Sequence, residues 1–340
     1  MTLKPVMLGI VAVIVVFGVV IGQDYAVIRT AQEDVLLMDT FVRLVAEGRE
    51  AESVLVQAVA EMSRLESLLS AHIPGSDVWR INESQGEPVV VSPEIIDVLE
   101  LATLVYDKSD GTFDVTVGAV MRTWGFGTDT LAVPSAEALA EAMRGVGFDS
   151  VAIDSDTRTV QLTNPYTRLD LGGIAKGYIV DRALEFIRSQ GIKHAIVDAG
   201  GDVRVMGGRP GKYLWDKSRP ARVGVQDPFS PEGLIAIVEV SEGSVLTSGD
   251  YERFFVQDEV RYTHIIDPRT GYPARGITSA TIVTEEAALA DAIATAVMVL
   301  GRDEGMKLIN SWAGVEGMLI TEDEEILISN GLKNTIQVLR

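Results

Sequence analysis

The sequence contains no cysteine. This excludes disulfide bonds, zinc–thiolate sites, thiol nucleophiles and lipidation of a cysteine behind a signal peptide. Basic residues are also scarce: 29 Lys and Arg stand against 49 Asp and Glu, a formal net charge of −20. Because nucleic acid phosphates need a basic surface, we expect no nucleic acid partner. An anionic substrate would need local positive charge or a bound metal.

What the chain does have is the composition of a globular protein. Of its 340 residues, 47% are hydrophobic and 23% are charged. This is enough for one large or two ordinary domains. We see no internal repeat, low-complexity segment or obvious linker after the first 24 residues.

A run near the N-terminus lacks polar residues altogether. The run VMLGIVAVIVVFGVVIG, residues 6–22, follows Lys4. Its length is near the lower limit of ~17–25 residues for a spanning helix. No small-x-small cleavage site follows it. We therefore predict an uncleaved signal anchor over residues 1–24, with Lys4 in the cytoplasm and residues 25–340 exported across the inner membrane to the periplasmic side.

The body predicts helices interspersed with hairpin-like strand pairs. Apolar periodicity and flanking proline or glycine indicate helices over residues 51–70, 93–111 and 135–147. Short β-rich runs indicate strands, among them residues 150–154, 159–163 and 194–200. This order predicts a mixed α+β domain rather than a regular βαβ array.

One charge interrupts the apolar stretch ALADAIATAVMVLG, residues 288–301: the carboxylate of Asp291. On a helix Asp291 and Thr295 share a face, about 6 Å apart. Two hard oxygens on one face suit a cation such as Mg²⁺. The alternative is that Asp291 caps a helix and its carboxylate accepts backbone N–H groups. The segment alone favours the cap, because a buried carboxylate needs only some donor or counter-charge.

A glycine turn marks the segment TRLDLGGIAKGYIVDRALEFIRSQG, residues 167–191, which predicts strand, turn and helix. Gly172 and Gly173 stand where the helix would start, so exposed N–H groups could bind an anion there. Lys176 adds a positive charge. Glycines at such turns also serve packing alone. Asp170 would repel a phosphate unless a metal or a hydroxyl-bearing ligand intervenes.

Three other turns carry candidate residues. DAGGDVRVMGG, residues 198–208, predicts a glycine-rich hairpin. THIIDPRTGYPA, residues 263–274, places His264, one of three histidines, just before a turn. This histidine could be a general base, a phosphate donor or an ordinary packed residue. GTFDVTVGAVMRTWGFG, residues 111–127, combines an acid, aromatics and glycines that could stack on a flat ring or fill the core.

The order of these segments resembles that of the FAD:protein FMN transferases, the ApbE family. The resemblance runs from about Met38 to the C-terminal region. It is carried by LMDTF, GTFDVTVG…WGFG, DLGGIAKGYIVD, DAGGDVRVMG, LTSGDYERFF, THIIDPRTGYP and ADAIATAVMVLG. The pattern H-I-I-D-P-x-T-G-x-P followed by A-D-A-x-A-T-A is the most specific part.

The resemblance implies a single mixed α/β domain that binds FAD, uses Mg²⁺, transfers FMN to a threonine hydroxyl of a target protein and releases AMP. It implies metal ligation by the side chains of Asp291 and Thr295 and by the carbonyl of Gly173. It implies FAD contacts from Met38, His72, Thr112, Phe113, Asp114, Asp170, Lys176 and the backbone near Ile266. His264, in the turn expected to face the phosphates, is our candidate general base or charge stabiliser.

Three positions depart from the family pattern. Some members carry a second acid where this chain has Ala294, so metal coordination here would rely more on water or on FAD phosphate. His72 stands where several relatives have a tyrosine, although an imidazole can still stack on a ring. Asp250 replaces a common serine, and no conclusion follows from that change.

Other functions use the same features. A Mg²⁺-dependent FAD pyrophosphatase would give FMN and AMP with water as the nucleophile, and a carrier would hold FAD without turnover. An electron-transfer flavoprotein would show redox activity without AMP release. The resemblance implies an acceptor with a Ser/Thr-Gly-Ala-Ser/Thr-x-Thr motif in a membrane redox complex subunit. No such motif occurs in this chain, so the acceptor is expected to be a separate protein.

Overall fold

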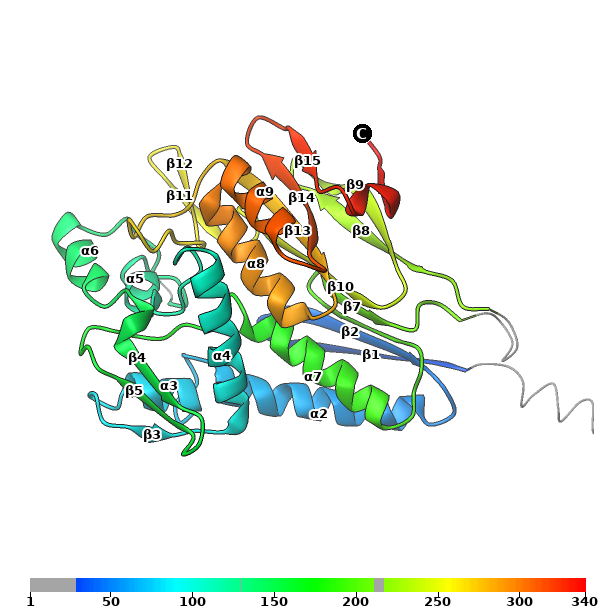
Figure 1. Ribbon diagram of the computed structural model, residues 1–340, viewed down its shortest axis with the longest axis horizontal. Helices are drawn as coiled ribbons and strands as arrows, with labels where there is room; N and C mark the ends of the chain where they lie inside the picture. Colours follow the sequence, from blue (N-terminus) through cyan, green and yellow to red (C-terminus); the bar gives the residue numbers. More distant parts are fainter. Residues whose placement is uncertain (1–28, 129, 211–216) are drawn as a thin grey trace, which may run out of the picture.

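A large antiparallel sheet forms the centre of the protein in the computed structural model, which describes residues 29–128, 130–210 and 217–340 (Figure 1). The strand order is β1-β2-β6-β7-β10-β13-β14-β15, and all neighbouring strands pair antiparallel. The strands are β1 (Thr30–Leu37), β2 (Thr40–Glu47), β6 (Ala195–Ala199), β7 (Asp202–Met206), β10 (Gly243–Gly249), β13 (Ile277–Thr284), β14 (Glu316–Thr321) and β15 (Ile326–Ile328). This confirms the predicted mixed fold without regular βαβ units.

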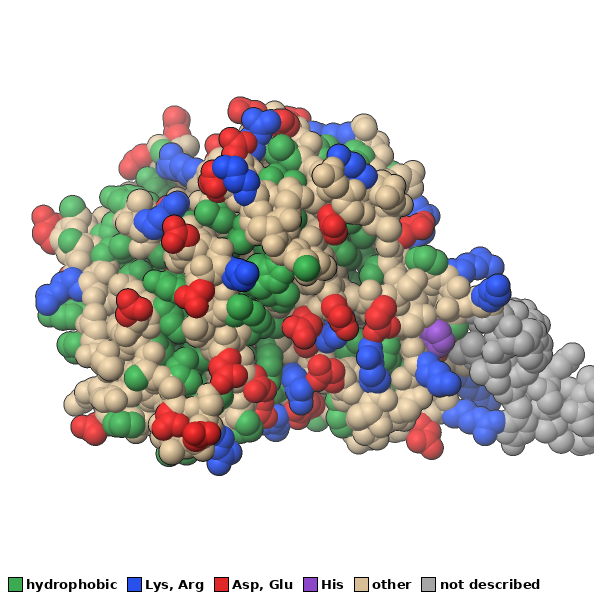
Figure 2. Space-filling view, viewed as in Figure 1, with side chains coloured by type: hydrophobic (Ala, Val, Ile, Leu, Met, Phe, Trp, Pro, Cys, Tyr) green, Lys and Arg blue, Asp and Glu red, His purple; other side chains and the backbone are tan. Residues whose placement is uncertain are grey.

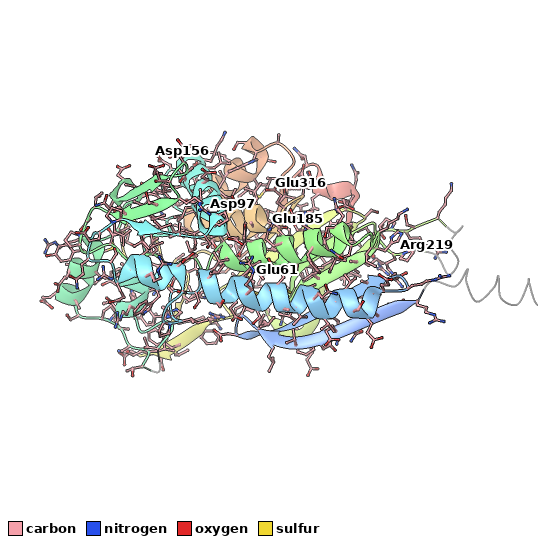
Figure 3. The ribbon with its side chains drawn as sticks, turned by 90° about the horizontal axis from the view of Figure 1, so that it is seen from below. Glu61, Asp97, Asp156, Glu185, Arg219 and Glu316 are labelled. Atoms are coloured by element: carbon pink, nitrogen blue, oxygen red, sulfur yellow. The ribbon has the colours of Figure 1, made fainter. Side chains whose placement is uncertain are left out.

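Helices cover one face of this sheet. They are α2 (Ala51–Leu69), α4 (Pro93–Lys108), α7 (Ala175–Ser189), α8 (Ala287–Leu300) and α9 (Arg302–Ser311). Seen from below, α2 and α7 lie side by side and carry Glu61 and Glu185 (Figure 3). Leu55, Leu184 and Ile293 of this layer share one buried core with strand residues such as Leu44. The apolar stripes of α2, α7, α8 and α9 therefore face the sheet, and α4 packs on α2 and α8.

A smaller sheet covers part of the opposite face. It consists of β8 (Ala221–Asp227), β9 (Ser230–Val240) and β16 (Ile336–Val338) in the order β16-β9-β8. Its residues Val223 and Ile235 pack with Val205 and Met318 of the large sheet in a second core. Strand β7 thus lies between two layers, which explains why all five of its residues are buried instead of alternating.

The remaining elements gather at one end of the helix layer. They are α3 (Asp77–Asn82), α5 (Gly118–Thr123), α6 (Ala136–Met143), the strands β3 (Val89–Val90), β4 (Val151–Asp154) and β5 (Thr159–Leu162), and the hairpin of β11 (Phe254–Gln257) and β12 (Val260–Thr263). Single 3₁₀ turns lie at Phe148–Ser150 and Leu332–Asn334. A third core surrounds the fully buried Trp124.

The predicted helices form, but two of them end earlier than predicted. Helix α4 stops at Lys108 because Asp110 and Gly111 adopt left-handed conformations with φ of 53° and 75°. Helix α6 stops at Met143, and Gly147 adopts φ of 137°. The glycines thus end each segment as expected, a few residues beyond the last helical hydrogen bond.

The strand predicted ahead of Gly172 is wrong. Residues 167–171 form no strand, and Arg168 makes only one isolated bridge, to Val117. The side chain of Asn82 takes the place of a neighbouring strand. Its Nδ2 donates to the Leu169 carbonyl at 2.9 Å, and the Leu169 N–H donates to its Oδ1 at 2.7 Å. Because a side chain satisfies both backbone groups, no ladder is needed there.

The predicted anchor over residues 1–24 lies outside the described residues. Within the described part of the chain, no helix combines the length and apolar character needed to cross a membrane.

Charged side chains are interspersed on the face shown in Figure 2, where acidic and basic groups alternate between apolar patches. Anion binding on this face would therefore rely on individual cations placed by the fold.

Candidate active site

A cavity of about 770 Å³ lies where the helix layer meets the β1–β2 turn and the β11–β12 hairpin. Its volume is within the range of small-molecule sites. Every residue that the sequence singled out as a site residue lines it: Met38, His72, Thr112, Phe113, Asp114, Asp170, Gly173, Lys176, His264, Ile266, Asp291 and Thr295. The fold therefore brings together segments more than 250 residues apart in sequence, as 38 and 295 illustrate. Their individual roles stay predictions.

The turn before α7 positions the glycines. The Gly172 N–H donates to Asp170 Oδ1 at 2.8 Å, so Asp170 stabilises the turn itself. At Gly173 an added Cβ would lie 3.0 Å from Thr295 Oγ1 and 3.3 Å from the Phe113 ring. A side chain at position 173 would therefore crowd the threonine, and glycine keeps this approach open.

Asp291 is buried on α8 and faces the start of α7. Its Oδ2 accepts a hydrogen bond from the Gly177 N–H at 3.1 Å. The capping alternative is therefore correct for one oxygen, and the helix it caps is the neighbouring one. Because the residue also lines the cavity, the carboxylate can serve a ligand there as well.

The charge around Asp291 is predominantly negative. Lys176 forms an ion pair with Asp202 at 2.6 Å, and Glu252 lines the same cavity. Burial, reinforced by the nearby Asp202, raises the pKa of the Asp291 carboxyl. Although burial opposes its charge, Lys176 has its pKa raised by Asp202 and Asp291. Lys176 pairs with Asp202 and Arg253 lies near Glu252, whereas Asp291 forms no ion pair within the described residues, so a further cation would be stabilised here.

The residues present fit a magnesium ion. The site combines a buried carboxylate, a threonine hydroxyl at i+4 and the backbone of a glycine that has no side chain of its own. All are hard oxygen donors, the type that Mg²⁺ prefers, with water or phosphate completing its coordination. Within the described residues no group of three His, Asp or Glu side chains forms a metal cluster. A Mg²⁺ held here would thus depend on its substrate and on water for its other ligands.

His264 is held as a neutral imidazole. Burial, together with the neighbouring Arg253, lowers the pKa of His264 to about 4. Its Nδ1 lies 3.1 Å from the Arg253 carbonyl. A carbonyl can only accept, so Nδ1 carries the proton and Nε2 keeps its lone pair. This is the protonation state that a general base requires.

The predicted FAD contacts are partly engaged in local hydrogen bonds. The Met38 N–H donates to Glu66 Oε1 at 2.8 Å, and Met38 has a left-handed φ of 55°. Asp114 Oδ1 accepts from the backbone N–H and the hydroxyl of Thr116 at 2.8 and 2.6 Å. Burial raises the pKa of the Asp114 carboxyl. These hydrogen bonds hold the cavity wall in place. The polar atoms of these residues that they do not use could contact a ligand.

The aromatic side chains of the cavity differ in accessibility. Phe113 is 3% exposed, so its ring packs into the wall more than it faces the cavity. His72 is exposed, and its ring lies against Gly127, where an added Cβ would be 2.4 Å from Cε1. Between the two, His72 has the more accessible ring for stacking on a flat group.

The sequence did not identify all of the residues that line the cavity. Glu66 was missed, and Asp202, Glu252 and Arg253 lay in quoted motifs without an assigned role. Asp202 follows the Gly200–Gly201 turn, which was predicted to be a hairpin and is one, joining β6 and β7. The acidic residue directly after a pair of glycines was the sequence feature that could have identified Asp202 as a site residue.

Known proteins with similar sequences and folds are flavin transferases. The ApbE family model matches residues 38–319. An "FAD:protein FMN transferase" of Treponema pallidum is 35% identical over 300 residues, which cover 85% of this chain and 83% of that protein. The crystal structure of an ApbE protein from Thermotoga maritima has a TM-score of 0.84 at 35% identity, covering 90% of this chain and 99% of that one. The flavin transferase ApbE from Vibrio cholerae has a TM-score of 0.80 at 27% identity, covering 91% and 99%.

Proposed function

The chain belongs to the ApbE family and is an enzyme of the FAD:protein FMN transferase type, and on this premise we propose that it uses Mg²⁺ to transfer FMN from FAD to a threonine hydroxyl of another protein, with release of AMP. The observation that supports this most directly is the convergence of Asp291, Thr295, Gly173 and His264 on one cavity. A metal site and a general base both promote phosphoryl transfer to a hydroxyl, and a neutral imidazole can supply the base.

In this proposal the side chains of Asp291 and Thr295 and the Gly173 carbonyl hold the Mg²⁺. Bound there, the metal would neutralise charge on the pyrophosphate of FAD. Lys176 contributes a cation from the first turn of α7, where backbone N–H groups also favour an anion. The family departure at Ala294 is consistent with a ligand set that has a single protein carboxylate.

The chemical step follows from the state of His264. Its Nε2 accepts the proton of the acceptor hydroxyl as the oxygen attacks the phosphorus on the FMN side. A phosphoester bond forms to the acceptor, and the bond from that phosphorus to the bridging oxygen breaks. The electron pair leaves with AMP. A low pKa in the free protein makes His264 a weak base, and the negative charge of bound FAD would raise that pKa.

The partner in this proposal is a protein with a Ser/Thr-Gly-Ala-Ser/Thr-x-Thr motif, in a subunit of a membrane redox complex. We also propose that residues 1–24 anchor the enzyme in the inner membrane and that the catalytic body faces the periplasm. An acceptor domain on that side of the membrane would be within reach of the cavity.

Mass spectrometry tests the function directly. The full chain would be incubated with FAD, Mg²⁺ and an acceptor domain with the threonine motif, alongside the Asp291→Ala variant. We expect the acceptor to gain the mass of FMN, AMP to appear, and the variant to be inactive. Free FMN and AMP with an unmodified acceptor would indicate the pyrophosphatase instead. Unchanged FAD would indicate a carrier.

A further inference from the structure

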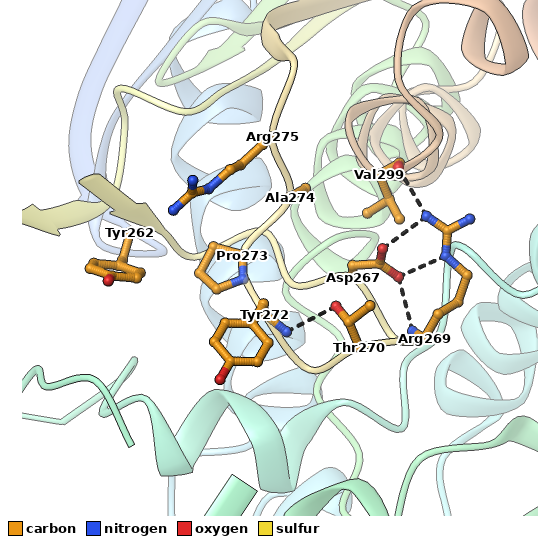
Figure 4. A pocket seen from close by; sticks show the side chains of 9 residues that line it. All are labelled: Tyr262, Asp267, Arg269, Thr270, Tyr272, Pro273, Ala274, Arg275 and Val299. Carbon is orange, nitrogen blue, oxygen red and sulfur yellow. Dashed lines mark hydrogen bonds and ion pairs between the residues drawn. The ribbon is translucent and has the colours of Figure 1, made fainter. Parts of the chain in front are cut away.

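A second hollow of about 420 Å³ lies on the outer side of the loop that borders the candidate active site. We call it the outer groove. Figure 4 shows its side chains, with Tyr262 and Arg275 on one side, Pro273 and Tyr272 at its centre, and Arg269 on the other side. Nothing in the proposed chemistry uses these residues.

The outer groove and the active-site cavity share one wall, residues 264–275. His264, Ile266 and Pro268 line the cavity, whereas Tyr272 and Arg275 line the groove. A ligand in the groove would therefore contact the same segment that borders the FAD site.

This shared wall is well supported. The Asp267 N–H donates to the Tyr272 carbonyl and the Gly271 N–H donates to the Asp267 carbonyl, both at 2.8 Å. The buried Trp124 donates from Nε1 to the Gly271 carbonyl at 2.8 Å. At Gly271 an added Cβ would lie 2.7 Å from Met143 Sδ. A polypeptide bound in the groove would thus meet a preorganised surface.

The distance from the groove to the reacting atoms is short. The His264 N–H donates to the Arg253 carbonyl at 3.0 Å, which continues the β11–β12 ladder by one pair. Tyr262 and His264 are therefore two residues apart on extended chain, about 7 Å along the strand. They point to the same side of the hairpin. An extended peptide over Tyr262 could place a neighbouring hydroxyl at His264.

The groove has the chemistry of a protein interface. Tyr262 and Tyr272 both contact the Trp124 ring, with centroids 5.3 and 5.6 Å apart, so their rings are held in place. Tyr272 is 49% exposed. Tyrosine, tryptophan and arginine are the residue types that dominate binding energy at interfaces.

Two arginines of the groove differ in their partners. Arg269 forms two hydrogen bonds with Asp267 at 2.9 and 2.8 Å. Arg275 is exposed and pairs with no carboxylate of the described residues, and Figure 4 shows its guanidinium directed toward the side of the groove where Tyr262 lies. In a chain with a net charge of −20, this cation offers a local point of attraction to a carboxylate.

We propose that the outer groove binds the acceptor protein, in the form of an extended segment next to the acceptor hydroxyl that bears a carboxylate for Arg275. The proposal rests on the transferase function proposed above. Tyr262 and Tyr272 would support the backbone and apolar side chains of that segment, and its continuation along the strand would bring the acceptor hydroxyl to His264 itself.

The test measures acceptor binding separately from transfer. An acceptor domain with the threonine motif, whose target threonine is replaced by alanine, would be titrated against the full-length enzyme by biolayer interferometry. The enzyme variants are Arg275→Glu and Tyr272→Ala. Lys193→Glu, an exposed charge reversal that lines neither cavity, is the matched control. FAD affinity, measured by flavin fluorescence, reports on an intact active site.

We expect Arg275→Glu to weaken acceptor binding at least tenfold, Tyr272→Ala to weaken it several-fold, and FAD affinity to stay within twofold. Replacing one acidic residue near the acceptor motif by lysine should restore binding to Arg275→Glu. Equal weakening by Lys193→Glu, or affinities within twofold for both groove variants, would overturn the proposal. An altered oligomeric state with unchanged acceptor affinity would do the same, since a second copy would then occupy the groove.

The two proposals fail in different ways. If the native acceptor is modified normally but binding does not depend on Arg275, the groove is wrong and the transferase function stands. If no FMN is transferred while binding still depends on Arg275, the groove stands and the function is wrong.

Discussion

Asp181 and Asp291 each cap the helix that carries the other. Asp181 of α7 accepts the N–H groups of Ala287 and Ala288 at 2.8 and 2.9 Å, at the start of α8. Asp291 of α8 accepts the N–H of Gly177 at 3.1 Å, in the first turn of α7. Neither helix has a side-chain cap of its own. The two aspartates therefore fix the register of α7 against α8, and with it the place where Lys176 and Asp291 meet.

The helices also approach each other too closely for a side chain at this crossing. An added Cβ at Gly177 would lie 2.3 Å from the Ala287 carbonyl. Only glycine allows the backbones to come within reach of both caps.

The first prediction concerns Asp181→Ala. The change removes the acceptor for two helix N–H groups and leaves Arg204, which is ion-paired with Asp181, buried without its partner. Breaking a buried pair costs about 3–5 kcal/mol. We expect the free energy of unfolding in urea to fall by that amount.

A neighbouring variant separates this effect from surface charge. Arg182→Ala breaks an exposed pair with Glu185, for which less than about 1 kcal/mol is expected. Similar losses for Asp181→Ala and Arg182→Ala would show that the reciprocal caps contribute little to stability.

The second prediction separates the two roles of Asp291. Asn at this position keeps a side-chain oxygen for the Gly177 N–H but lacks the charge for a cation. We expect the free energy of unfolding of Asp291→Asn to lie within about 1 kcal/mol of the wild-type value, because the cap is retained. The rate of FMN transfer should fall at least about 10–100-fold, since replacing even an outer-sphere partner of a metal lowers metal affinity or activity by that factor.

Two measurements check this prediction, urea unfolding without metal and calorimetric Mg²⁺ binding. Asp291→Ala, which lacks cap and charge, is the comparison and should lose both stability and Mg²⁺ affinity. If Asp291→Asn binds Mg²⁺ as tightly as the wild type, the metal role is wrong and the residue is a cap alone.

The sequence could predict the local parts of this site. Glycine pairs, apolar periodicity and the single charge among residues 288–301 are visible within short windows, and they correctly predicted the helices α2 and α7, while the resemblance to a family brought Asp291 together with the other site residues. A short stretch of sequence cannot show which distant residue a side chain will contact. Asp291 meets Gly177 across 114 residues, and Asp181 meets Ala287 across 106.

Asp202 illustrates the same limit. It begins β7, whose residues are all buried between two layers, so no alternating pattern distinguishes an inward acid from its neighbours. Its partner Lys176 was expected to face FAD alone. Only the tertiary fold shows that Lys176 is already paired. The strand predicted before Gly172 was wrong for a related reason, since the distant Asn82 satisfies that backbone.

The third prediction concerns the titration of His264. The chain has only three histidines, so their ring signals can be assigned in NMR spectra with a His264→Gln variant. Because burial and Arg253 lower the pKa of His264 to about 4, its ring should stay neutral from pH 8 down to about 5. Adding FAD should raise its midpoint through the phosphate charge.

This depressed pKa also sets the sign of a stability effect. Between pH 6.5, the ordinary value, and about 4, the unfolded chain binds more protons at this residue than the folded protein does. The contribution of His264 to stability is therefore present above pH 6.5 and is lost as the pH falls through that window. His264→Gln should flatten this part of the curve. A free-protein midpoint near 6.5 would contradict the neutral state of the imidazole.

The fourth prediction separates the structural and binding roles of Lys176. Lys176→Met leaves the carboxylate of Asp202, which is 3% exposed, without its cation. The free energy of unfolding should therefore fall by about 3–5 kcal/mol. Adding Asp202→Asn removes the stranded charge and should recover most of that loss. Asp202→Asn alone leaves a free lysine at the cavity.

If Lys176 binds the pyrophosphate, the FAD affinities of these three variants should differ in a defined order. Asp202→Asn should bind FAD at least as tightly as the wild type, because Lys176 no longer shares its charge with its ion-pair partner Asp202. The double variant, although stable, should bind FAD at least about tenfold more weakly. This corresponds to the loss of one hydrogen bond to a charged group, which contributes about 1.5–3 kcal/mol. Flavin fluorescence titrations measure all three. Should the double variant bind FAD like the wild type, Lys176 serves only to neutralise Asp202, and the phosphate must be held by the metal and the start of α7.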